Sequence, residues 1–372
     1  MKRYFAPILA ILTTAALVAR AAVGQAAGGD GAVPRYAHIF VIVLENKDQS
    51  QVIDPAAAPN IARLAKTYGL ASHFYAESHP SEPNYVAMVS GDTYGIRDDD
   101  AYYCHSGLKN QYCEKSMRPG YVNHTLTQPD LGSQLTSAGL TWKGYYESIP
   151  KPGSEAIVAG DPSWGAAAAH WELYASKHSG FLNFAAIQNS PKRSSLLVGF
   201  DQLDRDLAGP DMPALAFIVP NQCNDMHGLD PADYSADVAA AIPHECLHDN
   251  AAGLIKRGDV EVAKLVDKIQ ASPAWKAQAN AAIVITFDEG STDTPMGCCG
   301  IDPKSPSNFG GGLIPTVVIT NNGPRGLVDP TPYSHYSLLR TIEDAFGVHE
   351  YLGHAADTSA GVQPMVPLFA VR

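Results

Sequence analysis

Two apolar, β-branched runs of the sequence each end in a pair of polar residues that could bind a metal ion. The run AHIFVIVL stops at Glu45 and Asn46, and the run AAIVITF stops at Asp288 and Glu289. Such runs are typical of buried strands in a parallel sheet, and open α/β sheets bind ligands beyond the carboxyl ends of their strands. Three carboxylates at one edge would repel one another unless a cation lay between them. The alternative is that each pair caps its strand or the helix that follows.

Ser81 lies in the segment SHPSEPN, between Pro80 and Pro83. Pro83 suits the first turn of a helix, so Ser81 is predicted at the N-cap, at the positive end of the helix dipole. Free backbone N–H groups at such a position also bind phosphate. A serine there can be a cap and nothing more. Beside a metal it could instead be a nucleophile, because metal coordination lowers the pKa of a hydroxyl group.

Histidines supply further candidates for the site. His227 follows the apolar run 215–219 and could be a metal ligand, a phosphate contact or a general acid, and His335 begins the last helical pattern. His178 is a weaker candidate. A lone histidine is more often a structural residue, and four histidines in polar segments are expected at the surface: His244, His248, His349 and His354.

The chain has 372 residues and a formal net charge of −12. This charge argues against nucleic-acid binding, which needs clustered Lys and Arg, and weakly against loose binding to anionic lipid. It does not exclude a small anionic substrate at a metal, because a bound cation dominates the local field.

Residues 1–26 have the pattern of an export signal. Lys2 and Arg3 precede an apolar stretch at residues 5–18 that is short for a membrane span, and small residues follow. We therefore predict a signal peptide, no membrane span after its cleavage, and a secreted or periplasmic protein. The alternative is a membrane anchor.

The six cysteines are predicted to form disulfides, because an even number in an exported chain without a CxxC pair favours disulfides over metal binding. The natural local pairs are Cys104 with Cys113 and Cys223 with Cys246, and the pairing of the adjacent Cys298 and Cys299 is left open.

Strand-like and helical segments alternate along the chain, which predicts an α/β fold with three layers, α/β/α, around a mainly parallel central sheet. One catalytic domain is expected over residues 34–350, with a C-terminal tail at 351–372 lying on it. Loop-rich insertions are expected at 96–130, 147–170 and 228–250. The expected strands are 37–44, 71–76, 140–146, 215–219, 281–287 and 314–320, and the expected helices are 59–68, 83–89, 251–269 and 336–346.

Five segments in a fixed order carry a resemblance to a known family. They are HIFVIVLEN, SHPSEPNYVAMVSGDTYG, IVPNQCNDMHG, IVITFDEG and YSHYSLLRTIEDAFG, and they extend from His38 to Gly347. Together they resemble the phosphoesterase family of secreted bacterial acid phosphatases, fungal acid phosphatases and bacterial phospholipases C. The likeness is strongest to the secreted acid phosphatase branch, and it implies an alkaline-phosphatase-like fold.

The resemblance also implies roles for individual residues. Ser81 would be the nucleophile, and His227 or His335 would protonate the leaving alcohol. The implied metal ligands are Glu45, Asn46, Asp288 and Glu289, and the implied phosphate contacts are Asn84, His79 and His178.

The expected activity is hydrolysis of a phosphate monoester through a phosphoserine. The expected cofactor is a divalent metal ion, with Mg, Ca, Mn and Zn not distinguished, and the expected substrate is a small phosphate ester or a phospholipid head group. The alternatives are a phospholipase C or other phosphodiesterase, and a non-catalytic protein that binds a phosphate ligand.

Overall fold

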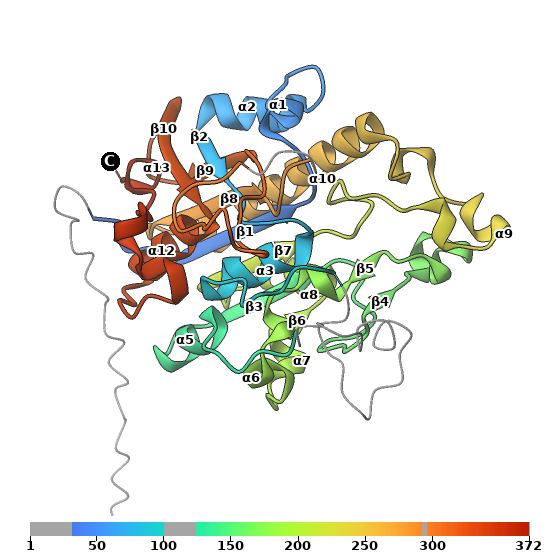
Figure 1. The fold of residues 1–372 in the computed structure, drawn as a ribbon, viewed down its shortest axis with the longest axis horizontal. Coiled ribbons are helices and arrows are strands. Elements are labelled where there is room, and N and C mark those ends of the chain that lie inside the picture. Colours follow the sequence, from blue (N-terminus) through green and yellow to red (C-terminus); the bar gives the residue numbers. More distant parts are fainter. Residues whose placement is uncertain (1–31, 100–123, 292–295, 372) are drawn as a thin grey trace, which may run out of the picture.

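The central sheet of the computed structural model, which describes residues 32–99, 124–291 and 296–371, has eight strands in the order β10-β2-β9-β8-β1-β7-β3-β6 (Figure 1). Strand β9 is antiparallel to its neighbours β2 and β8, and the other pairs are parallel, which confirms the predicted mainly parallel sheet. The strands are β1 (His38–Leu44), β2 (Gly69–Tyr75), β3 (Trp142–Tyr146), β6 (Leu197–Val198), β7 (Leu215–Val219), β8 (Ala281–Phe287), β9 (Thr316–Thr320) and β10 (Leu327–Ser334).

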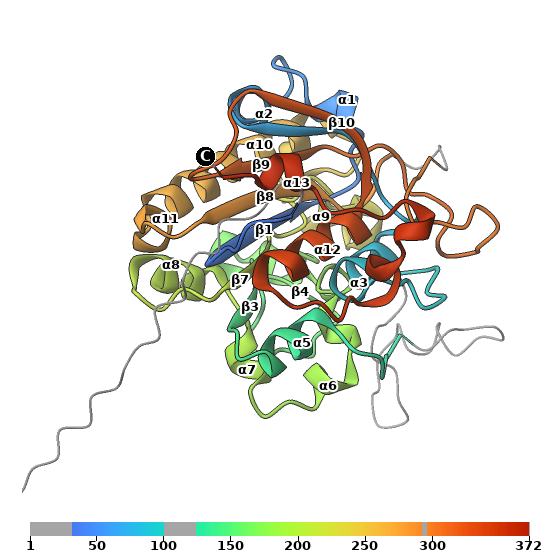
Figure 2. The same ribbon diagram turned by 90° about the vertical axis from the view of Figure 1, so that its left-hand side faces the viewer.

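Helices cover both faces of this sheet (Figure 2). One face carries α2 (Pro59–Thr67), α8 (Phe200–Ala208), α10 (Ala251–Ala271) and α11 (Pro273–Lys276), and the other carries α3 (Ser81–Ser90), α5 (Leu131–Ser137) and α12 (His335–Phe346). The predicted α/β class and three layers are thereby confirmed. The shorter elements are α1 (Gln49–Val52), β4 (Val158–Ala159), β5 (Tyr174–Ala175), α6 (Ala185–Gln188), α7 (Arg193–Leu196), α9 (Ala236–Ala239) and α13 (Val366–Phe369).

The apolar sequences of β1 and β8 follow from the central position of these strands in the sheet. Strands β1 and β8 pair over seven residues, from His38 with Ala281 to Leu44 with Phe287. Helices cover both faces of these strands, so nearly every position is buried and an unbroken apolar run is required.

Three features of the sheet differ from the prediction. Strand β6, which has only two residues, was not expected. Strand β10 was not expected, because its sequence LVDPTPYS contains two prolines. It lies at the edge of the sheet, where a missing backbone N–H is tolerated. Strand β9 was expected at residues 314–320, but its antiparallel direction cannot be read from its apolar pattern.

Two disulfides lie among the described residues. The predicted pair Cys223–Cys246 is confirmed, and it ties the insertion at 228–250 to the segment that follows β7. Cys298 and Cys299, whose pairing the sequence left open, are bonded to each other. Cys104, Cys113 and the predicted signal at residues 1–26 lie outside the described residues. Within the described ranges, no helix is long and apolar enough to cross a membrane.

Helix α2 receives its N-terminal cap from another helix. Its own N-cap residue is Ala58, which has no capping side chain. The buried carboxylate of Asp259 on α10 accepts hydrogen bonds from the backbone N–H groups of Ile61 (2.8 Å) and Asn60 (3.2 Å) and from Asn60 Nδ2 (2.9 Å). This contact joins two helices on one face of the sheet and satisfies N–H groups that a helix start leaves without partners.

We therefore expect Asp259→Ala to lower the free energy of unfolding by about 2 kcal/mol, because buried N–H groups lose their acceptor. Urea denaturation would measure this loss. The control is Asp267→Ala, which changes an exposed residue of the same helix and should alter stability by less than about 0.5 kcal/mol. Equal stability of the two variants would contradict the capping role.

Candidate active site

The register of β1 and β8 brings the two predicted polar pairs to one edge of the sheet. Beyond the paired Leu44 and Phe287, the backbone N–H of Asp288 donates to Leu44 O at 2.9 Å. The backbone N–H of Asn46 donates to Asp288 Oδ1 at 3.0 Å, and Asn46 Nδ2 donates to Glu45 Oε2 at 3.1 Å. The parallel pairing of two strands therefore gathers residues that are more than two hundred positions apart in the chain.

Helix α3 presents Ser81 to these carboxylates. The helix begins at Ser81, with Pro80 as its N-cap, so Ser81 lies one residue further into the helix than predicted and its side chain does not cap. Its hydroxyl donates to Glu45 Oε2 at 3.0 Å and lies 3.3 Å from Glu289 Oε1. The geometry thus favours a chemical role for Ser81 over a capping role.

A fourth carboxylate, Asp225, lies in the site and was not predicted. It follows β7, the strand that pairs with β1, and its backbone carbonyl accepts a hydrogen bond of 2.8 Å from Glu45 N–H. Its side chain is fully buried. The available signal was the polar run NQCND after the apolar strand, but Asp225 reaches the site only because the chain turns back between β7 and His227.

The four carboxyl groups are buried, and burial is the largest cause of their raised pKa values. The charge of Asp288 raises the pKa values of the other three further: Glu45, Asp225 and Glu289.

The oxygens Asp225 Oδ2 and Asp288 Oδ2 accept no hydrogen bond within the described part of the chain. Buried, like-charged oxygens without donors are what a hard divalent cation would satisfy. The residues present therefore fit a metal ion, which Glu45, Asp225, Asp288 and Glu289 could hold.

Two histidines complete a second set of possible ligands. His178 Nε2 lies 3.3 Å from Glu45 Oε1, and His178 Nδ1 lies 3.6 Å from Asp225 Oδ2. Glu45, His178 and His227 each offer one ligand atom, and these atoms lie within 4.8 Å of one another. Burial, and then the nearby charge of Lys177, lower the pKa of His178 and bring that of His227 to about 3. Both rings are therefore neutral near pH 7, as metal-binding histidines are.

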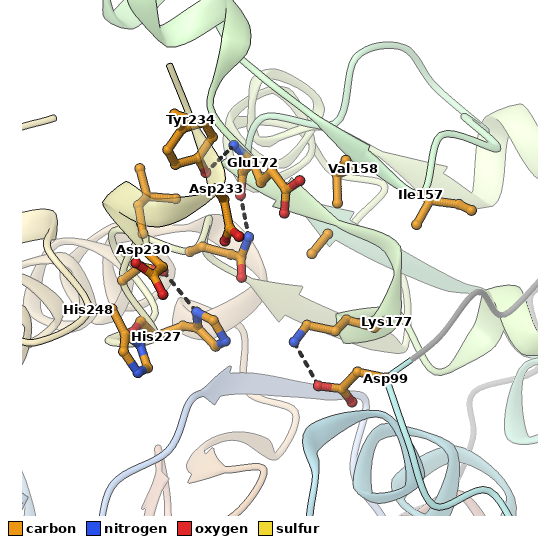
Figure 3. A pocket seen from close by; sticks show the side chains of 14 residues that line it. Asp99, Ile157, Val158, Glu172, Lys177, His227, Asp230, Asp233, Tyr234 and His248 are labelled. Carbon is orange, nitrogen blue, oxygen red and sulfur yellow. Dashed lines mark hydrogen bonds and ion pairs between the residues drawn. The ribbon is translucent and has the colours of Figure 1, made fainter. Parts of the chain in front are cut away.

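A cavity of about 300 Å³ opens beside this cluster (Figure 3). His227 and Lys177 reach it from two sides, and Asp99, Glu172 and Tyr234 form parts of its wall. Asp99 joins the cavity to α3, because its Oδ1 accepts a hydrogen bond of 2.9 Å from the backbone N–H of the residue after Ser81. The cavity therefore lies next to the start of α3, where Ser81 is.

Other predicted residues support the site from outside the cavity. Asn84 Oδ1 accepts from the backbone N–H groups of Glu77 and Ser78, both at 3.0 Å, and its Nδ2 donates to the carbonyls of Ser78 and Pro80. Asn84 therefore shapes the loop that leads to Ser81.

His335 and His79 each pair with a carboxylate. The Nδ1 atom of His335 contacts Glu77, and its Nε2 donates to Phe287 O at 2.8 Å. Burial alone would lower the pKa of His335, but the Glu77 carboxylate raises it overall. His79 Nδ1 lies 2.5 Å from Glu289 Oε2. Both ring nitrogens of His335 are engaged away from the cavity, whereas His79 contacts the carboxylate next to Ser81.

Ser81 thus begins a buried helix, and its hydroxyl faces carboxylates that could hold a cation. The chain belongs to the phosphoesterase family, whose sequence model matches residues 51–349. The family resemblance inferred from the five segments is confirmed.

Two relatives agree with this assignment. The chain is 29% identical over 327 residues to the phosphatidylinositol-3-phosphatase of Mycobacterium tuberculosis, and the match covers 88% of this chain and 82% of the relative. It is 27% identical over 312 residues to an acid phosphatase of Aspergillus fumigatus, covering 83% of this chain and 54% of the relative. The protein is therefore an enzyme, a phosphoric ester hydrolase.

Two solved structures match most of the chain. The PsFucS1 sulfatase from Pseudoalteromonas sp. is 14% identical with a TM-score of 0.50, and the match covers 91% of this chain and 72% of that one. A protein in the alkaline phosphatase superfamily from Vibrio parahaemolyticus is 12% identical with a TM-score of 0.49, covering 85% and 68%. At 14% identity the sulfatase likeness bears on the fold alone, and it agrees with the three layers described above.

We expect chelation of divalent metal to lower the melting temperature of the protein, because the buried carboxylates then repel one another without an offsetting charge. In Glu45→Gln, one of these charges is gone, so the variant should bind less metal and should lose less stability on chelation. Elemental analysis and thermal unfolding with and without chelator would measure both effects.

The matched control for this prediction is Glu343→Gln, which replaces a buried carboxyl group near the C-terminal end of α12. This carboxyl group accepts hydrogen bonds from the side chain of Gln134 and the backbone N–H of Leu352. Its metal content should equal that of the unmodified protein. Unchanged metal content in both Glu45→Gln and Asp288→Asn would exclude these two residues as ligands.

Proposed function

We propose that the protein is an exported, metal-dependent phosphatase that hydrolyses phosphate monoesters through a phosphoserine at Ser81. The observation that carries the proposal is the position of the Ser81 hydroxyl, 3.0 Å from Glu45 Oε2 and 3.3 Å from Glu289 Oε1. A hydroxyl in that position has a proton acceptor in place and lies where a bound cation would lower its pKa. Export is proposed from the pattern of residues 1–26.

The first step would be attack of Ser81 Oγ on phosphorus, in line with the departing alcohol. The hydroxyl proton would pass to one of the two carboxylates within its reach, Glu45 or Glu289. A divalent ion held by Glu45, Asn46, Asp288 and Glu289 would supply positive charge for the nucleophile and for the phosphate oxygens. The start of α3 adds backbone N–H groups that favour an anion.

The leaving alcohol needs a proton, and His227 is the better placed of the two histidines expected to give it. His227 lines the cavity, whereas both ring nitrogens of His335 are bonded elsewhere. The Nδ1 atom of His227 lies 2.8 Å from Gly228 O, which leaves Nε2 for the substrate or a metal. A bound phosphate would raise the pKa of His227 from its value of about 3, because an anion favours the imidazolium form.

The proposed substrate is a small phosphate monoester, including a phosphorylated lipid head group. The names of the two relatives, a phosphatidylinositol-3-phosphatase and an acid phosphatase, point to phosphate monoesters. A cavity of about 300 Å³ fits one small alcohol or sugar-like group beside the phosphate.

Replacing Ser81 by alanine should lower kcat by about 10³-fold or more, because no covalent intermediate can form. The measurement is hydrolysis of p-nitrophenyl phosphate, together with mass spectrometry of acid-quenched protein for a phosphoryl group on Ser81. Ser90→Ala is the control, since Ser90 is also buried on α3 but bonds Val86 O. Near-normal turnover by the Ser81 variant would refute the assignment.

A panel of esters distinguishes the proposed activity from a phosphodiesterase or a phospholipase C. The monoester p-nitrophenyl phosphate should give the highest kcat/KM, followed by bis-p-nitrophenyl phosphate and phosphatidylcholine. A preference for either diester would replace the phosphatase proposal. Phosphate binding without hydrolysis of any ester, across added metals, would indicate a binding protein.

A further inference from the structure

An ion pair between Lys177 and Asp99 connects the cavity to the helix that carries Ser81. Lys177 Nζ lies 2.8 Å from Asp99 Oδ2, and Asp99 Oδ1 accepts a hydrogen bond of 2.9 Å from the backbone N–H of Glu82. Glu82 directly follows Ser81 in the chain. The Asp99 carboxylate therefore uses two donors, an ammonium group and an N–H at a helix start, which equally suit a phosphate oxygen.

Lys177 is the one lysine or arginine that lines the cavity within the described ranges (Figure 3). Lys47 is also near the carboxylates, but its ammonium group donates to the carbonyls of Asn46 at 3.0 Å and Met226 at 2.9 Å. A phosphate dianion at Ser81 lies beside four buried carboxyl groups and needs positive charge to offset them. Lys177 is the cationic side chain placed to supply part of that charge.

The backbone next to Asp99 is held by contacts that do not involve Lys177. Asp98 Oδ1 lies 3.0 Å from His124 Nε2, and His124 Nδ1 lies 2.9 Å from Glu82 Oε2. These contacts join the segment to α3 through a buried histidine. The backbone at this position is therefore held independently of the ion pair between Asp99 and Lys177.

We propose that Lys177 binds the phosphate of the substrate, and that Asp99 competes with this phosphate for Lys177 and for the Glu82 N–H. The inference rests on the proposed function, because it places the phosphate at Ser81. Asp99 is then a residue that sets the affinity of the site: each substrate molecule must displace a carboxylate, and product phosphate is released more readily when the carboxylate returns.

The test is calorimetric binding of inorganic phosphate to the metal-loaded protein. Lys177→Met should weaken binding about tenfold or more, because a charge-assisted contact is lost. Asp99→Asn should tighten binding about three- to tenfold, since the amide keeps the size of the side chain but competes poorly for Lys177. In the double variant, Asp99→Asn should give much less improvement than it gives alone, because the ammonium group for which Asp99 competes is gone.

Two controls isolate this contact. Asp233→Asn removes the same charge from the other side of the cavity, away from Lys177, and should change phosphate affinity by less than about twofold at 0.15 M salt. Lys143→Met breaks a comparable ion pair, in which Lys143 Nζ lies 2.5 Å from Asp206 Oδ2. The change in its melting temperature shows how much stability the protein loses when such an ion pair alone is removed.

The outcomes separate the inference from the function on which it rests. Weaker binding in Asp99→Asn, similar to Lys177→Met, would overturn the competition and make Asp99 a residue that positions Lys177. Unchanged affinity in both variants would overturn the phosphate contact. If the unmodified protein hydrolyses no phosphate ester but these shifts in binding appear, the proposed function fails and the inference about Lys177 stands.

Discussion

Mutual repulsion among buried carboxyl groups is the constraint on which the rest of this structure depends. Glu45, Asp225, Asp288 and Glu289 follow three adjacent strands and lie within a region from which water is excluded. Burial and like charge oppose their ionisation, so the cluster is stable only when protons or a cation offset the charge. The parallel register of β1, β7 and β8 imposes this proximity, and the apolar cores of the same strands supply the burial energy that permits it.

The proposed nucleophile, Ser81, is positioned by polar contacts around a helix that is buried on all sides. All ten residues of α3 are buried, and its position beside α12 is fixed by packing. The loop before it is held by Asn84, and the Glu77–His335 pair fastens that loop to α12. Asn84 and His335 thus hold the backbone from which Ser81 projects, and their contact with phosphate stays a prediction.

The opposite side of the site is built by less regular parts of the chain. Lys177 and His178 come from a short turn after β5, and His227 comes from a segment tied down by the Cys223–Cys246 disulfide. These parts carry the cationic and acidic groups that line the cavity. The carboxylate cluster is thus built on the strand ends, whereas less regular segments form the cavity that, in the proposed function, would select among phosphate esters.

The sequence by itself determined the strands that are buried on both faces. Short unbroken apolar runs rich in β-branched residues favour strands buried on both faces, so β1, β7 and β8 were predictable. The polar pairs that end two of these strands were predictable as well, as was the local Cys223–Cys246 pair. The tertiary structure alone decided the antiparallel direction of β9 and the presence of β10 at the edge of the sheet. It also decided that Asp225 lies beside the other carboxylates, and that Asn84 and His335 form hydrogen bonds with the loop before Ser81. The reason is physical: periodicity reports which residues are buried, whereas side-chain partners far apart in the chain depend on how the buried elements are placed against one another.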